Sequence, residues 1–238
     1  MREADEIGVR SHFPQRPAPS GPRLRPTIRR MLTPEQLTGF LLAAVLITAT
    51  PGPDNLMVLG LGISRGRLQG MVFGLGCALG CLSHTLLAVL GVSALIAASP
   101  WAFSWLKIGG GLYLLWLGWQ ALRSRGGAQV GAVQTPEEPL MRLFFKGVLA
   151  NAINPKVVLF FLSFLPQFVV AERGDVPLQM AVLGLLFTLQ AAVLFVSLGY
   201  FAGAIGQRLN RRPRTGLWLD RIAGAVFVAL GLRLILVR

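Results

Sequence analysis

The 238-residue chain is too apolar for a surface that faces water, because 53% of its residues are hydrophobic, only 14% are charged, and its mean hydropathy is +0.61. This composition favours lipid as the main solvent and excludes a sizeable soluble domain. The net charge of +13 would indicate nucleic-acid binding in a soluble protein. Here the basic residues lie mostly in short gaps between apolar runs, as in membrane-protein loops, so we expect no nucleic-acid partner.

The first 30 residues are rich in arginine and proline and contain no apolar run that could form the core of a signal peptide. We expect this leader to be disordered. Directly after it, Thr33, Pro34 and Gln36 have the spacing of a helix cap and the first helical turn. A single transmembrane domain is therefore expected over residues 31–238.

Six apolar segments follow, and most reach the roughly 20 residues that a hydrocarbon core requires. They are residues 37–59, 71–97, 103–122, 147–170, 178–205 and 222–237. The last is short and contains Arg233, whose side chain can extend toward the membrane interface. The sequence thus predicts an all-α polytopic membrane protein with about six transmembrane helices.

The basic residues are concentrated in the first, third and fifth gaps. This alternation places those gaps in the cytoplasm, including a long polar loop at about 123–146. With six spans both chain ends lie outside, which is the wrong side for an arginine-rich leader. Either translation starts at Met31, which we favour, or one segment is re-entrant and the number of spans is odd.

The long loop divides the domain into two sets of three spans, so a repeat between the halves must have inverted topology. The first span of each half contains a polar break with proline, at residues 50–55 and 151–156. Unwound backbone at membrane depth must line a cavity or be buried in protein. Paired breaks therefore predict a central transport site.

Asp54 is the only acidic residue within an apolar span, where an ionised carboxylate costs on the order of 2.5 to 3.5 kcal/mol. Pro51 and Pro53 cannot donate backbone hydrogen bonds, and Gly52 loosens the chain, so nearby backbone groups are free to meet a polar ligand. Asp54 is predicted to bind a substrate ammonium group, to carry a coupling proton, or to alternate between the two. In the alternative interpretation it caps the helix after the break.

Asn55 adds an amide to the first break, and Asn154, Pro155 and Lys156 form the matching part of the second. Three interpretations of Lys156 stay open. Its ammonium group pairs with Asp54, attracts a substrate carboxylate, or snorkels to the cytoplasmic face.

Other polar residues in the spans favour packing roles. Cys77 and Cys81 share one helix face without metal-ligand neighbours. His84 could relay protons, but a hydrogen-bonded packing role is favoured. The glycines at 70, 74, 76 and 80 predict close helix contacts. Since no phosphate loop, zinc spacing or catalytic triad is found, we expect neither an enzyme nor a bound cofactor or metal.

Several motifs resemble the LysE/RhtB family of amino-acid exporters, over about residues 31–238. They are Thr50-Pro51-Gly52-Pro53-Asp54, the turn at 64–66 with the glycine series after it, and the run 146–156 leading into 160–168. The resemblance implies a multi-pass exporter of amino acids or close derivatives in the bacterial inner membrane, driven by proton exchange, and it allows a homodimer. It places both breaks, including Asn154 and Pro155, near the centre of the transport path.

There are three alternatives to an amino-acid exporter. A heavy-metal or cation exporter of related fold would be expected to carry histidine-rich or acidic loops, and the chain has only two histidines. A membrane thiol-disulfide electron carrier needs reactive cysteines on facing helices, whereas Cys77 and Cys81 share one. A purely structural subunit leaves the cost of burying Asp54 unexplained.

Overall fold

The computed structural model describes residues 32–92, 94–95, 99–124, 138–211 and 213–236. The predicted leader and most of the predicted loop at 123–146 lie outside these ranges. Within them every regular element is a helix, which confirms the all-α prediction. The predicted cap is present at the start of the domain, where the Thr33 hydroxyl accepts from Gln36 N at 3.2 Å and Gln36 Oε1 accepts from Thr33 N at 3.0 Å.

Each half begins with a broken helix. The first half consists of α2 (Pro34–Ala49), α3 (Pro53–Ser64), α4 (Arg67–Leu87) with the π-helix η1 (Ala88–Val92), and α6 (Pro100–Arg123). The second half consists of α7 (Leu140–Ala152), α8 (Pro155–Leu159), η2 (Phe160–Phe164), η3 (Leu165–Phe168), η4 (Ala171–Arg173), α9 (Val176–Tyr200), α10 (Ala202–Arg211) and α11 (Pro213–Leu236). At the two predicted breaks the chain bends by 57° between α2 and α3 and by 50° between α7 and the segment Pro155–Phe168, which comprises α8, η2 and η3.

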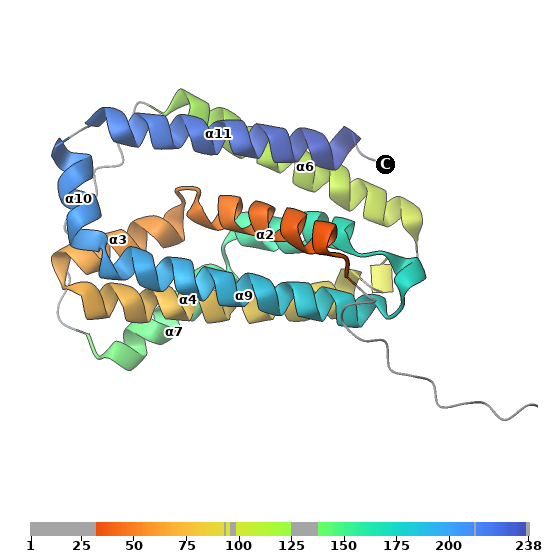
Figure 1. The fold of residues 1–238 in the computed structure, drawn as a ribbon, viewed down its shortest axis with the longest axis horizontal. Coiled ribbons are helices and arrows are strands. Elements are labelled where there is room, and N and C mark those ends of the chain that lie inside the picture. The colour runs from red at the N-terminus through yellow and green to blue at the C-terminus, as the bar shows by residue number, and fades with distance from the viewer. Residues whose placement is uncertain (1–31, 93, 96–98, 125–137, 212, 237–238) are drawn as a thin grey trace, which may run out of the picture.

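The elements of the second half run opposite to their counterparts in the first (Figure 1). In the first half, the direction alternates from the pair α2–α3 to α4 and then to α6. In the second half, it alternates in the opposite order from the pair α7–α8 to α9 and then to α11. This is the arrangement that an inverted repeat requires. The α3–α4 turn, the start of α7, and α10 all lie at one end of the bundle, so the basic gaps share an end as predicted from the charge pattern.

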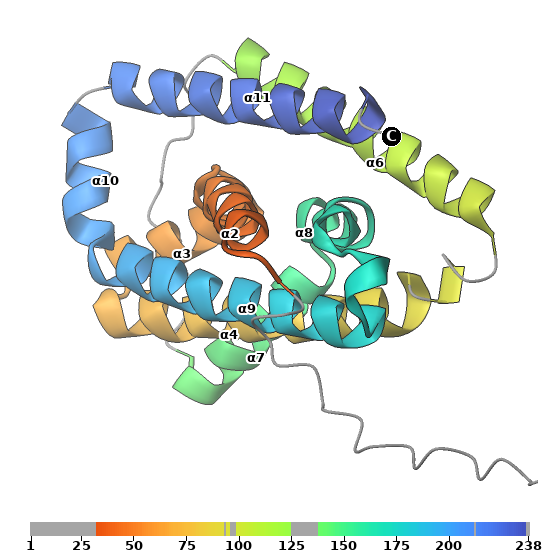
Figure 2. The same cartoon turned by 45° about the vertical axis from the view of Figure 1, so that its right-hand side comes forward.

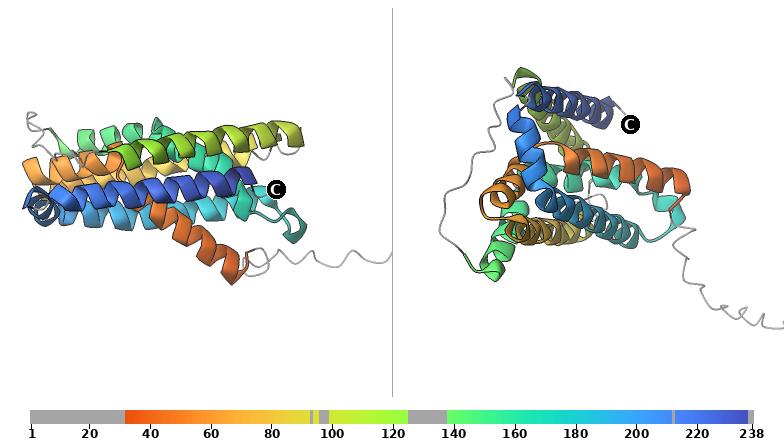
Figure 3. Two further views of the ribbon diagram at one scale, coloured as in Figure 1. Left: turned by 90° about the horizontal axis from the view of Figure 1, so that it is seen from above. Right: turned by 60° about the vertical axis from the view of Figure 1, so that its left-hand side comes forward.

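The two broken helices lie in the middle of the molecule. Figure 2 shows α2 and α8 between the α6–α11 pair on one side and α4, α7 and α9 on the other. Figure 3 shows that α2 is inclined to the bundle and that its N-terminal end leans away from it. Both breaks are therefore surrounded by helices from both halves.

Two to four of the six predicted spans have the length and apolar character needed to cross a membrane. Two are continuous, Arg67–Gly91 and Val176–Tyr200, and the two bent pairs qualify if each counts as one span. For α6 and α11 the span assignment stays a prediction. Leu86 and Leu189, with 59% and 64% of their surface exposed, illustrate the apolar side chains on the outer surface, which suit contact with lipid.

Glycines bring the helix backbones into contact, as predicted for the glycine series. A Cβ on Gly76 would meet the carbonyl oxygen of Phe144 in α7, and a Cβ on Gly147 would meet the carbonyl oxygen of Phe73 in α4. Close approach of this kind replaces the hydrophobic effect as the main source of helix packing in lipid. The α4–α7 contact carries Asn151, the residue before the end of α7, against α4.

The α4–α7 contact predicts that Gly147→Ala destabilises the fold by about 1 to 3 kcal/mol, because backbone atoms cannot yield to the new methyl group as a side chain would. The matched control is Gly109→Ala in α6, where an added Cβ meets nothing within 4 Å. This control should be neutral or gain up to about 1 kcal/mol of helix propensity. Reversible unfolding in mixed detergent micelles measures both, and equal stability of the two variants would contradict the contact.

Candidate functional site

The two breaks meet each other at the centre of the bundle. In the first, α2 ends at Ala49, Thr50 is extended, and Gly52 precedes Pro53 at the start of α3. In the second, α7 ends at Ala152, and Asn154 caps α8 by accepting from Lys156 N at 3.0 Å. Side chains from each break bond directly to the other, although about 100 residues separate them in sequence.

Asp54 is buried, with 2% of its surface exposed, and its carboxylate Oδ2 accepts a hydrogen bond from Asn151 Nδ2 at 2.8 Å. The cap position of α3 belongs to Gly52, and Asp54 is the second residue of the helix. The interpretation of Asp54 as a helix cap is therefore wrong. Its negative charge in the first turn is nevertheless favoured by the positive end of the helix dipole.

Lys156 is also buried, with 7% of its surface exposed. Its Nζ donates to the carbonyl oxygens of Ile47 at 3.2 Å and Thr50 at 3.1 Å. The snorkelling interpretation is therefore wrong. No ion pair within 4.0 Å joins Lys156 to Asp54, two residues that both lie in the described ranges, so the direct pairing interpretation does not hold either. Attraction of a substrate carboxylate stays a prediction.

Asp54 and Lys156 occupy equivalent positions in the two halves. Each is the second residue of the helix after the break and follows a proline, Pro53 or Pro155. Each side chain then reaches the end of the opposite first half-helix, because Asp54 bonds to Asn151 on α7 and Lys156 bonds to carbonyls at the end of α2. The two charges thus cross-link the halves reciprocally.

Asn151 is the residue of this site to which the sequence assigned no role. It is fully buried and donates to Asp54, while its Oδ1 accepts from Cys81 Sγ at 3.4 Å and its main-chain oxygen lies 3.0 Å from His84 Nε2. Two polar side chains of α4 therefore converge on the end of α7. The available signal was an amide inside an apolar span, four residues before the proline of the break.

The predicted amides act mainly on the backbone of the breaks. Asn55 Nδ2 donates to the carbonyl oxygen of Thr48 at 2.9 Å, and Gln190 Nε2 of α9 donates to Thr48 Oγ1 at 2.9 Å. Asn154 caps α8. Asn55 and Asn154, like Pro51, Gly52, Pro53 and Pro155, shape the breaks, whereas Asp54 and Lys156 line a cavity between them.

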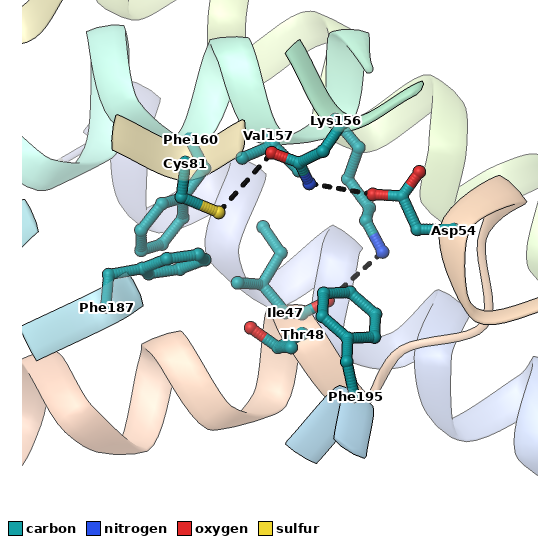
Figure 4. Close-up of a pocket in the computed structure, with 10 residues that line it drawn as sticks. Ile47, Thr48, Asp54, Cys81, Lys156, Val157, Phe160, Phe187 and Phe195 are labelled. Atoms are coloured by element: carbon teal, nitrogen blue, oxygen red, sulfur yellow. Dashed lines mark hydrogen bonds between the residues drawn. The ribbon is translucent and has the colours of Figure 1, made fainter. Parts of the chain in front are cut away.

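The cavity combines one carboxylate and one ammonium group with an aromatic wall. Figure 4 shows Asp54 and Lys156 on one side and the rings of Phe160 and Phe187 on the other. The full lining is Ile47, Thr48, Asp54, Cys81, Asn151, Lys156, Val157, Phe160, Phe187 and Phe195. The cavity is small. The centre of a water molecule can occupy only about 10 Å³ of it, so the cavity holds about one water molecule. An amino acid enters only if the lining moves.

The thiols and the imidazole of α4 pack around this site. Cys77 and Cys81 are free and buried. The ring of His84 packs against Phe161 with 5.6 Å between ring centroids. Among the residues that the structure describes, no three His, Cys, Asp or Glu side chains form a group that could hold a metal ion. The arrangement is suited to binding a charged small molecule.

Comparison with known proteins gives one consistent family. The family model for LysE type translocators matches residues 45–238. The threonine efflux protein of Salmonella typhimurium is 34% identical over 84% of this chain and 98% of its own length. The threonine efflux protein of Escherichia coli K12 is 31% identical over 82% of this chain and 94% of its own length. The leucine efflux protein of Enterobacter sp. strain 638 is 29% identical over 82% of this chain and 92% of its own. No solved structure matches.

The bond between Asp54 and Asn151 predicts energetic coupling between the two side chains. In a double-mutant cycle of Asp54→Ala and Asn151→Ala, we expect a coupling of about 1.5 to 3 kcal/mol in the free energy of unfolding, because the bond involves a buried charge. The control cycle combines Asp54→Ala with Gln179→Ala, because Gln179 bonds to Val170 and Gly174 and has no bond to Asp54. Strict additivity of the Asp54 and Asn151 substitutions would contradict the assignment.

Proposed function

Because the chain belongs to the LysE type translocator family, we propose that it exports amino acids or close derivatives from the bacterial cytoplasm in exchange for protons. The names of the threonine and leucine efflux proteins support an amino-acid substrate. The observation that carries the proposal is that Asp54 and Lys156, one from each half, line a single buried cavity. The predicted homodimer stays a prediction.

A free amino acid is a zwitterion, and the cavity offers one group for each of its charges. The Asp54 carboxylate attracts the ammonium group and the Lys156 ammonium group attracts the carboxylate, both in surroundings where charge interactions are stronger than in water. Phe160, Phe187 and Phe195 leave an apolar surface for the rest of the molecule. The opposite charges orient the substrate.

Transport follows if the two halves rock about the paired breaks. The bonds of Asp54 and Lys156 across the halves hold the centre closed. Substrate binding exchanges these bonds for bonds to the ligand, and a ligand shifts such an equilibrium only by its difference in affinity between the two states. The crossing bonds are therefore the element that alternating access has to rearrange.

Proton exchange follows from competition for one carboxylate. A proton on Asp54 removes the negative charge that attracts the substrate ammonium group, so proton and substrate exclude each other. The other ionisable groups at the site are Lys156 from α8 and Cys81 and His84 from α4. Where the proton concentration is higher, outside the cell, the proton displaces the substrate, and an inward proton gradient drives outward transport.

The first test is efflux from cells preloaded with labelled threonine or leucine. We expect efflux that a protonophore abolishes and that Asp54→Asn lowers by about 10- to 100-fold, the equivalent of a charge-assisted hydrogen bond of about 1.5 to 3 kcal/mol. Glu138→Gln is the matched control, because Glu138 lies outside the cavity in an exposed ion pair with Lys146 at 2.7 Å. Full efflux by Asp54→Asn at equal membrane abundance would refute the role of the carboxylate.

The second test is the dependence of efflux on external pH. In proteoliposomes with fixed internal pH, acidifying the outside should speed the release of substrate, because protonation of Asp54 expels the ammonium group. Asp54→Asn cannot take up this proton, so its residual rate should not change with external pH. A similar pH response in the variant and the native protein would place the coupling proton on another group.

A further inference from the structure

The ammonium group of Lys156 occupies a receptor built from main-chain oxygens. Its partners, the carbonyl oxygens of Ile47 and Thr50, lie at the end of α2, where carbonyl groups lack partners within the helix and carry the negative end of the helix dipole. In transporters, such half-helix ends bind cations. Here the bound cation is a primary ammonium group that belongs to the protein.

Gly52 provides the space for this ammonium group. A Cβ at position 52 would lie 2.9 Å from Lys156 Nζ and 3.5 Å from its Cε. The backbone of Gly52 is extended, with a φ of −163°, a conformation that any residue adopts. The glycine is therefore required for the room it leaves beside the carbonyl oxygens rather than for its conformational freedom.

The receptor adjoins the cavity, since Ile47, Asp54 and Lys156 all belong to the cavity lining. Figure 4 shows the Lys156 side chain running past Asp54 to reach the end of α2. An amino acid in the cavity carries the same chemical group as the end of the lysine side chain. Substrate and lysine can thus compete for the same two oxygens.

We propose that the α-ammonium group of the transported amino acid binds between the carbonyl oxygens of Ile47 and Thr50 and displaces Lys156, whose freed ammonium group then pairs with the substrate carboxylate. This inference rests on the proposed export of amino acids. Lys156 is an internal competitor that fills the receptor between transport cycles. The exchange conserves the charge of the site, and it makes a primary ammonium group a requirement for substrates.

The receptor is tested with n-propylammonium, which contains the ammonium group without a carboxylate. Binding to purified protein is measured by calorimetry, with n-propanol as the neutral control. Lys156→Ala should bind the cation about tenfold or more tighter than the native protein, because the competitor that occupies the receptor is gone. Adding Gly52→Ala to this variant should abolish the gain, since the new Cβ fills the receptor. Equal binding by native protein and Lys156→Ala, or a gain that survives Gly52→Ala, would overturn the proposal.

A measurement on the native protein decides the case if Lys156→Ala does not fold. Efflux of labelled leucine is competed from inside by unlabelled leucine, by its N,N-dimethyl derivative and by the matching 2-hydroxy acid. We expect the last two to compete about tenfold or more weakly, because neither presents a primary ammonium group. Equal competition by all three would overturn the receptor while leaving amino-acid export intact. Absence of leucine and threonine efflux from the native protein would instead count against the proposed function, and n-propylammonium binding would still test the receptor.

Discussion

The structure depends on one constraint, which is that two interrupted helices at membrane depth must satisfy their freed polar groups inside the protein. The polar groups of each interrupted helix form hydrogen bonds with those of the other. Lys156 from the second break donates to carbonyl oxygens at the end of α2, and Asp54 from the first break accepts from Asn151 at the end of α7. Neither break is complete without the other half of the chain.

The surrounding helices bring these groups together and close the space around them. Contacts at Gly76 and Gly147 hold α7 against α4, which brings Cys81 and His84 to Asn151. Phe160 of η2 and Phe187 and Phe195 of α9 form the apolar wall of the cavity, and the ring centroids of Phe160 and Phe187 lie 5.1 Å apart. The buried charges therefore face a small cavity with an aromatic wall.

The sequence predicted the breaks and singled out Asp54 and Lys156 as candidate site residues, because prolines and charges inside apolar runs are local signals. It did not predict the partners of Lys156 or the role of Asn151. Those contacts join residues about 100 positions apart and depend on how the inverted halves pack, which no local pattern encodes. Residues such as Phe187 and Phe195 are ordinary apolar positions of a span, and only their place on α9 brings them to the cavity. The spans assigned to α6 and α11 stay predictions, because length and apolar character do not settle them.

The most direct test of a site shared between the breaks is an experimental structure with threonine or leucine bound, determined by cryo-electron microscopy with an antibody fragment as a fiducial. We predict that the amino acid lies between the breaks, with its carboxylate at Lys156 and its ammonium group beside Asp54 at the end of α2. An amino acid bound elsewhere, for example between α6 and α11, with the bond from Asn151 to Asp54 and those from Lys156 to α2 unchanged, would contradict the central site.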